Sequence, residues 1–212
     1  MLTGDKATEV AKKRYNRIAP LYDFMVGLME MSRYYRRELL WSKVEGVHIL
    51  EVGVGTGKSF SYYPSDVVIT AVDFSDRMLK RAKDKASKQK VKVRLQQMDV
   101  QNLEFEDNTF DTVVASFVFC SVPDPVRGLM EVKRVCKPGG KVVLLEHVLS
   151  ANRILGWFMN LANPLLVPML GANINRQTAE NVSKSDLVVE LVTGLGAGIF
   201  KLIEARKKTL SS

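Results

Sequence analysis

The sequence predicts one α/β domain, built on a sheet of seven mostly parallel strands with helices on both faces. Five short runs rich in valine and isoleucine, helix-like segments between them, and a strand–turn–strand pattern near the C-terminus lead to this prediction. Runs that are apolar on nearly every residue are typical of strands buried on both faces. The five runs are Val47–Val52, Val67–Val72, Val91–Met98, Thr112–Phe119 and Lys141–Val148.

Two helices are predicted between these runs. Ser75 is a suitable N-cap for a helix over Asp76–Lys88, because its hydroxyl can accept a hydrogen bond from the first turn. Asp124 and Pro125 begin a second helix that runs through Cys136, and the sequence Lys-Pro-Gly-Gly at 137–140 ends it. Strands and helices that alternate at these intervals form right-handed crossover units, which produce a parallel sheet.

The two ends of the chain follow other patterns. Residues Lys6–Trp41 are amphipathic, and we expect two helices there with a break near Ala19 and Pro20. Near the C-terminus, Leu187–Val192 and Gly198–Arg206 alternate as strands do, and glycines at 194 and 196 lie between them. This pattern predicts an antiparallel hairpin, since a strand and not a helix follows the glycines.

Composition is that of an ordinary globular protein, with 212 residues of which 46% are hydrophobic. The formal net charge of +8 gathers in the N-terminal third and between residues 77 and 94. A basic surface attracts anionic lipid or nucleic acid, or it is simply solvated. Cys120 and Cys136 lie in apolar stretches, so we expect them to be reduced residues of the core. Because no disulfide is expected, the protein is expected to be cytoplasmic, with a peripheral contact to the inner membrane face as a further expectation.

A glycine-rich loop follows the first buried strand directly, and it is the strongest functional signal in the chain. It contains Gly53, Gly55 and Gly57, and Asp73 stands at the end of the next strand. Glycines let the backbone turn sharply and approach a ligand, and a carboxylate at Asp73 can accept hydrogen bonds from both hydroxyls of a ribose. The spacing G-x-G-x-G differs from the G-x-G-x-x-G of dinucleotide sites, which disfavours a nicotinamide-dependent oxidoreductase. A phosphate loop is excluded because Val52 stands where that motif requires glycine.

Five motifs then occur in order, at residues 51–57, 72–79, 98–100, 110–114 and 137–140. As a set they resemble the successive motifs of class I S-adenosylmethionine-dependent methyltransferases, over roughly residues 45 to 148. The resemblance implies a Rossmann-like fold and S-adenosyl-L-methionine as cofactor. It also divides the single domain into an N-terminal helical lid (1–44), a cofactor-binding core (45–148), an acceptor-side insert (149–185) and the C-terminal hairpin (186–212).

The resemblance implies a role for each matching residue. The methionine part of the cofactor would be surrounded by the glycine loop and the end of the fourth strand, and the ribose would be held by Asp73. The adenine would lie against Phe74 and Met78, with Asp99 accepting from its amino group and the Val100 backbone N–H completing the contact. The residues expected around the methionine part are Glu51, Gly53, Gly55, Gly57, Ser116 and Phe117, and Tyr15 would close over the cofactor.

Methyl transfer to a nucleophile displaces a neutral sulfur leaving group, so it requires positioning and no metal. A base is needed only if the acceptor must lose a proton. His48 lies inside the first strand, where a structural or exposed role is expected. His147 follows Glu146 at the C-terminal end of the fifth strand, where ligands bind in open α/β sheets, and it is a candidate base or orienting group.

The segment after the fourth strand lacks the N/D-P-P-Y/F loop of enzymes that methylate nucleobases, so no nucleic-acid partner is expected. Four segments resemble the quinone C-methyltransferases, the bacterial phospholipid N-methyltransferases and the membrane-associated thiol methyltransferases. These segments are Tyr15–Asp23, Glu146–His147, Asn163–Pro164 with Gly171, and Asn175–Thr178. A further segment, Phe119–Asp124, is most similar to the phospholipid and thiol enzymes.

This resemblance implies a lipophilic or membrane-borne acceptor, and the leading expectation is the amine headgroup of a phospholipid. The alternatives are a quinol C-methyltransferase, a small-molecule thiol or amine methyltransferase, and a regulatory protein that binds the cofactor without turnover. Tyr22, His147 and Arg176 are the candidate acceptor contacts. Tyr22 and His147 are also the candidate catalytic residues. Arg176 is included because a guanidinium can bind phosphate through two hydrogen bonds.

Overall fold

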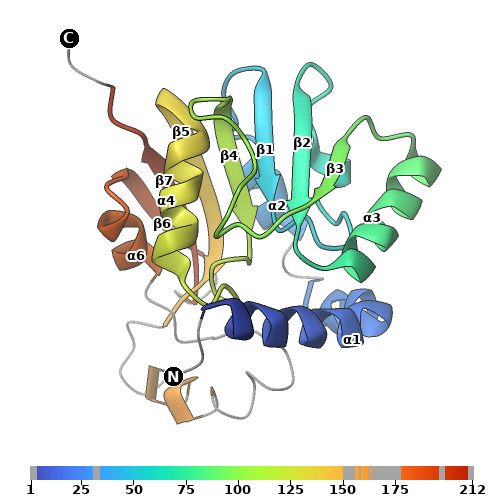
Figure 1. Cartoon of the computed structure of the whole chain (residues 1–212). Helices are drawn as coiled ribbons and strands as arrows, with labels where there is room; N and C mark the ends of the chain where they lie inside the picture. Colours follow the sequence, from blue (N-terminus) through green and yellow to red (C-terminus); the bar gives the residue numbers. More distant parts are fainter. Residues whose placement is uncertain are drawn as a thin grey trace.

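A computed structural model describes residues 4–30, 34–149, 156–157, 159–161, 163, 178–195 and 199–209. Its centre is a twisted seven-stranded sheet (Figure 1), in the order β3-β2-β1-β4-β5-β7-β6. Strands β1 to β5 are parallel, and β7 is antiparallel to both β5 and β6. The predicted mostly parallel sheet and C-terminal hairpin are therefore confirmed. The strands are β1 (His48–Val52), β2 (Val68–Asp73), β3 (Arg94–Gln97), β4 (Phe110–Ser116), β5 (Cys136–His147), β6 (Val188–Leu195) and β7 (Phe200–Arg206).

Helices cover both faces of the sheet, as predicted. On one face lie α4 (Pro125–Val135) and α6 (Thr178–Lys184), and on the other lie α2 (Tyr34–Trp41) and α3 (Asp76–Gln89). Central strand β4 shows why its sequence is continuously apolar. Val113 packs toward α4 while Val114 packs toward Trp41 of α2, and both are fully buried.

The predicted helix starts are confirmed. The Ser75 hydroxyl accepts from the Met78 backbone N–H at 3.2 Å, and the Asp124 carboxylate accepts from the Arg127 N–H at 3.0 Å. The predicted end of α4 is wrong, because Cys136 already belongs to β5. Cys136 pairs with Phe110 of β4, so strand pairing with a distant segment decides where the helix stops.

The predicted break near Ala19 and Pro20 is also wrong. Helix α1 (Gly4–Glu30) continues through Pro20, and α2 is a separate helix that begins at Tyr34. Proline removes the N–H that would bond the carbonyl four residues earlier, which here belongs to Asn16. The Arg77 guanidinium of α3 donates to that carbonyl at 3.3 Å, so the contact with α3 replaces the missing bond.

Helix α1 crosses the carboxyl ends of the parallel strands (Figure 1), where ligands bind in folds of this class. Both cysteines are free and buried, as expected. Among the described helices, none has the length and apolar content needed to cross a membrane.

Candidate active site

A pocket lies at the carboxyl ends of β1, β2 and β4, beneath α1. It contains about 690 Å³ of empty space, a volume that includes open solvent at its mouth. The structure brings ten of the fifteen predicted site residues together in its lining. These are Tyr15, Tyr22, Gly53, Gly55, Asp73, Phe74, Met78, Val100, Ser116 and Phe117.

The three loop glycines all have a positive φ, but only at Gly55 would an added side chain enter open space. A side chain at Gly55 (φ +57°) would meet no atom within 4 Å. A Cβ at Gly53 would lie 2.4 Å from the Val118 side chain, and one at Gly57 would lie 2.3 Å from the Phe60 ring. Gly57 is absent from the lining, and close packing against Phe60 explains why a glycine stands there. Gly55, in contrast, leaves room for a ligand.

Asp73 is held by the loop that it faces. Its Oδ2 accepts from the Gly55 backbone N–H at 2.8 Å and its Oδ1 accepts from the Ser75 N–H at 2.9 Å. Burial raises the pKa of Asp73 to about 6, against the lowering effect of these two N–H donors. The carboxylate is therefore fixed in orientation and still ionised at neutral pH.

The predicted adenine side of the pocket is apolar. Phe74 and Met78 line it, and the Tyr15 ring meets the Phe74 ring edge-on at 5.6 Å. Asp99 is not part of the lining, because both of its oxygens accept from the Gln101 side-chain amide. That amide also donates to Thr8 of α1 at 2.9 Å. Gln101 was not predicted as a site residue. Its position two residues after Asp99 is the only feature of the sequence that indicates it.

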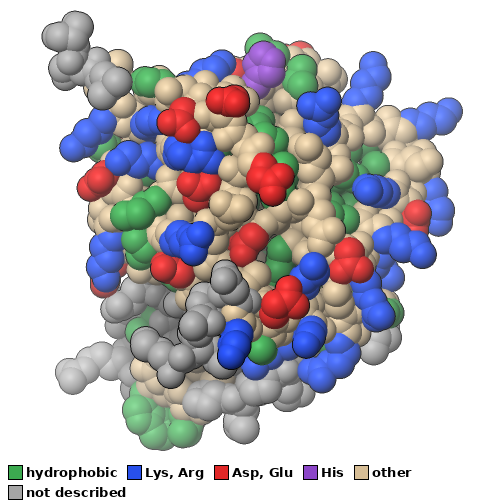
Figure 2. All heavy atoms as spheres, in the orientation of Figure 1, with side chains coloured by type: hydrophobic (Ala, Val, Ile, Leu, Met, Phe, Trp, Pro, Cys, Tyr) green, Lys and Arg blue, Asp and Glu red, His purple; other side chains and the backbone are tan. Residues whose placement is uncertain are grey.

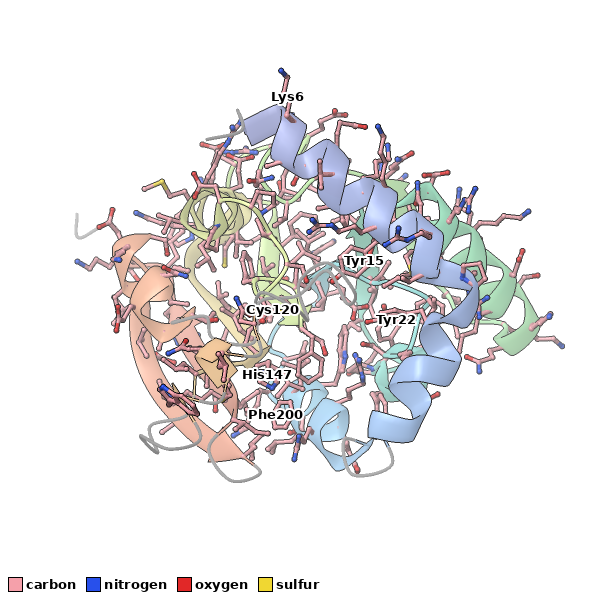
Figure 3. All side chains as sticks on the ribbon, turned by 90° about the horizontal axis from the view of Figure 1, so that it is seen from below. Lys6, Tyr15, Tyr22, Cys120, His147 and Phe200 are labelled. Atoms are coloured by element: carbon pink, nitrogen blue, oxygen red, sulfur yellow. The ribbon has the colours of Figure 1, made fainter. Side chains whose placement is uncertain are left out.

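Helix α1 is fastened to the pocket rim by polar contacts. The Tyr15 and Ser121 hydroxyls are 2.5 Å apart, and burial raises the pKa of Tyr15 well above its ordinary value. Asn16 accepts from the Ser75 hydroxyl at 2.6 Å and donates to Asp76 at 2.8 Å. Tyr22 follows on the same helix, with the Lys58 ammonium 5.7 Å from its ring centre. Figure 3 shows Tyr15 and Tyr22 on the side of α1 toward Cys120 and the strand ends.

The loop after β4 is organised by a residue that the sequence motifs did not assign. Glu146 is fully buried, and its carboxylate accepts from the backbone N–H groups of Val118 and Phe119 at 2.9 Å and of Cys120 at 3.3 Å. Burial raises the pKa of Glu146 to about 7, although these donors act in the opposite direction. Phe117 adopts a left-handed backbone (φ +59°), uncommon for a bulky residue and often found at ligand sites.

Glu51 lies beneath the pocket and not in its lining. It accepts a hydrogen bond from the Tyr63 hydroxyl, and burial raises its pKa despite that donor and the nearby Arg37 charge. Arg37 was not predicted. Its guanidinium donates to the hydroxyls of Ser116 at 2.8 Å and Ser59 at 3.3 Å, so it fixes the end of β4.

The remaining candidates lie elsewhere. His147 is outside the pocket lining, and its ring meets the Phe200 ring edge-on at 5.0 Å. His48 is exposed, with Nδ1 3.7 Å from Asp111, as the exposed alternative predicted. Arg176 and most of the 149–185 insert lie outside the described residues.

The lining has one carboxylate, four aromatic rings and no basic side chain among the described residues. A cationic ligand atom suits such a surface, since aromatic faces attract positive charge. The open space over Gly55 and the fixed Asp73 carboxylate fit a ribose-containing sulfonium cofactor.

Comparison with known proteins agrees with this geometry. A family model described as a methyltransferase domain matches residues 50–144. A phosphatidylethanolamine N-methyltransferase of Cereibacter sphaeroides is 42% identical over 141 residues, which cover 66% of this chain and 68% of that protein. A ubiquinone/menaquinone biosynthesis C-methyltransferase of Bdellovibrio bacteriovorus is 29% identical over 180 residues, or 80% of this chain and 75% of the other.

The fold is also similar to that of solved structures. A SAM-dependent methyltransferase from Thermotoga maritima superposes with a TM-score of 0.71 at 21% identity, over 93% of this chain and 100% of that one.

Proposed function

Because the chain belongs to the class I S-adenosylmethionine-dependent methyltransferases, we propose that it methylates the amine headgroup of a phospholipid. The methyltransferase activity and the cofactor follow from the family. The acceptor is our proposal, and the aromatic lining of the pocket is the observation that carries it.

The chain's own residues would hold S-adenosylmethionine as follows. The Asp73 carboxylate would accept from the ribose hydroxyls, and Phe74 and Met78 would lie against the adenine. Gly55 would leave room for the methionine part, with Gly53 and Ser116 beside it. When bound, the cofactor supplies a methyl group on a positively charged sulfur.

A nitrogen acceptor suits the other half of the lining. Tyr15, Tyr22 and Phe117 offer aromatic faces to an amine that becomes more positively charged as it gains a methyl group. A neutral amine is required for attack, so the ammonium group of the headgroup first gives its proton to solvent water. We propose that Tyr22 orients the amine, and that His147 is a base or an orienting group on the acceptor side of the pocket.

The relatives support this choice and define the main alternative. Phosphatidylethanolamine N-methyltransferase is the name of the 42% identical relative, and quinone C-methyltransferase is the name of the relative that aligns over more of this chain. A quinol ring would also fit an apolar, aromatic pocket. Quinol C-methylation is therefore the second candidate, and a small-molecule thiol or amine acceptor the third.

Peripheral contact with a membrane would bring such an acceptor to the pocket. Lys6, Lys13 and Arg17 are exposed on α1, the helix that also carries the lining residues Tyr15 and Tyr22. Lys and Arg side chains also gather over α3, at the right edge of the molecule in Figure 2, so charge alone does not distinguish α1 as the membrane-facing element. Anionic lipid attracts such basic residues with about 1 kcal/mol each.

The decisive experiment incubates the protein with cofactor labelled in its methyl group and three acceptors in detergent micelles. These are phosphatidylethanolamine, a demethylmenaquinol and an alkyl thiol. Label in phosphatidylethanolamine supports the proposal, and label only in the quinol or the thiol replaces it with that alternative. Absence of label in all three, with cofactor binding intact, contradicts each of these acceptors.

A further inference from the structure

Two adjacent arginines on α2, Arg36 and Arg37, differ in the hydrogen-bond partners of their guanidinium groups. Arg37 donates to Ser116 and Ser59, as described above. The guanidinium of Arg36 lies over the Phe200 ring, with its carbon 4.1 Å from the ring centre. Its Nη1 is buried and has no hydrogen-bond partner among the described residues.

Arg36 belongs to an aromatic cluster that reaches the pocket. The Phe200 ring lies 5.9 Å from the Phe117 ring, and Phe117 is part of the lining. His147 stands opposite Phe200 in the β5–β7 pairing, and its ring lies 5.0 Å away. Figure 3 shows His147 and Phe200 beside α2, across the strand ends from Tyr15. The arginine is therefore a neighbour of the acceptor side and not of the adenine side.

A buried guanidinium nitrogen without a partner is unfavourable, because it has lost its water and gained nothing in return. An anion with two exposed oxygens would match the planar donors of arginine. Among the described residues, the carboxylates in or beside the pocket already have partners. Asp73 accepts from two backbone N–H groups, Glu146 accepts from three, and Glu51 accepts from Tyr63. The missing partner is thus expected to arrive with a ligand.

We propose that Arg36 binds the phosphate diester of the acceptor, while the amine of the same headgroup enters the pocket past Phe117. This inference rests on the proposed function, since a phospholipid headgroup carries a phosphate next to its amine. It assigns to α2 the phosphate contact that the sequence suggested for Arg176. Phe200 and His147 then form the floor and wall of a phosphate subsite at the pocket rim.

The test compares Arg36→Met, Arg36→Lys and a control, Arg94→Gln. Methionine keeps an apolar stem over Phe200 and removes the charge. Arg94 is exposed on β3, so its substitution removes the same charge at a site outside the pocket lining. We expect Arg36→Met to raise the KM for phosphatidylethanolamine about ten- to hundredfold and to leave the KM for the cofactor unchanged. Arg36→Lys should give a smaller rise, and Arg94→Gln none.

Thermal unfolding separates a binding role from a structural one. Replacing an unpaired buried charge by an apolar side chain should leave the Tm of Arg36→Met equal to or above that of the wild type. A Tm several degrees lower would show that Arg36 stabilises the fold, and would overturn the proposal. An unchanged KM for phosphatidylethanolamine in Arg36→Met would overturn it as well, while leaving the methyltransferase reaction intact.

A binding measurement separates this inference from the proposed function. Calorimetry with dihexanoylphosphatidic acid, which has the phosphate without the amine, should show binding to the wild type and loss of binding in Arg36→Met. That result would stand even if no phospholipid amine were methylated. The same calorimetric measurement is made with two water-soluble ligands, inorganic phosphate and glycerophosphoethanolamine. If inorganic phosphate binds as tightly as the lipid, the site is one for free anions and the lipid assignment is wrong.

Discussion

The hydroxyls of Tyr15 and Ser121 meet at 2.5 Å, although 106 positions separate them in the chain. This contact joins α1 to the loop after β4, across the rim of the pocket. We expect Tyr15→Phe, Ser121→Ala and the double variant to show a coupling energy of about 0.5–1.5 kcal/mol in cofactor binding. Calorimetry on the four proteins measures it. Additive effects would mean that the two hydroxyls act separately on the cofactor.

Gly55→Val should abolish cofactor binding, because the side chain would enter the space that a ligand needs. The positive φ of Gly55 adds strain, and Gly139→Val is the matched control. Gly139 has φ +72°, and a Cβ there would meet only the Thr209 hydroxyl, at 3.4 Å. Both variants should lose stability, and only Gly55→Val should lose the cofactor. Binding by a folded Gly55→Val protein would contradict the assigned position of the cofactor.

Cofactor affinity should depend on the ionisation of Asp73. Burial raises the pKa of this group to about 6, and a ribose hydroxyl donates a stronger hydrogen bond to the ionised carboxylate than to the protonated acid. The dissociation constant should therefore stay constant above about pH 7, rise as the pH falls through about 6, and level off at the weaker affinity of the protonated form. Asp73→Asn should bind more weakly by about 1.5–3 kcal/mol and show a flat profile. A variant as pH-dependent as the wild type would assign the titration to another group.

Glu146→Gln should disturb the loop after β4. The glutamine amide has only one acceptor oxygen. Its NH₂ group would face some of the backbone N–H groups that now donate to the carboxylate, and two donors repel each other. We expect a stability loss of about 2–3 kcal/mol at neutral pH and a higher KM for the cofactor. Urea unfolding and steady-state kinetics measure the two effects. Unchanged kinetics in a stably folded variant would limit Glu146 to a structural role.

The same residue gives a stability effect with a definite sign. Burial raises the pKa of Glu146 to about 7, so the folded state keeps its proton while the unfolded state loses it above about pH 4.5. The stabilisation from this proton is complete below pH 4.5 and is lost as the pH rises to about 7. The free energy of unfolding of the wild type, measured relative to Glu146→Gln, should fall over that interval. A difference that rises would show a lowered pKa.

Vesicle binding should follow the charges of α1. Lys13→Gln with Arg17→Gln should weaken binding to anionic vesicles by about 2 kcal/mol, and added salt should weaken binding of the wild type. Lys83→Gln with Lys88→Gln, on exposed positions of α3, removes the same charge from another helix. Sedimentation with vesicles distinguishes them. Equal losses in both double variants would mean that overall charge, and not α1, attracts the membrane.

Most of the sheet could be predicted because its strands are buried on both faces, as the continuous apolar runs indicate. The errors have local causes. Val118 and Phe119 read as strand, but their N–H groups bind Glu146 and the chain leaves the sheet at Phe117. Strand β3 is shorter than predicted, since it is an edge strand with a single partner, β2.

The pocket could be predicted where a motif fixes the backbone, as at Gly55 and Asp73. It could not be predicted where distant segments meet. Arg37 reaches Ser116 across 79 positions, and Gln101 reaches Thr8 across 93. No local pattern in the sequence encodes such pairs.

The contact between α1 and α3 around Pro20 affects which substitutions the two helices tolerate. Two carbonyls of α1, those of Asn16 and Pro20, accept from Arg77 and Arg81 of α3. Because the acceptors are main-chain atoms, many side chains can replace one another on this face of α1 without loss of these bonds. Arg77 and Arg81 have no such freedom. Substitutions can therefore accumulate along this face of α1 while its main chain stays bound to α3.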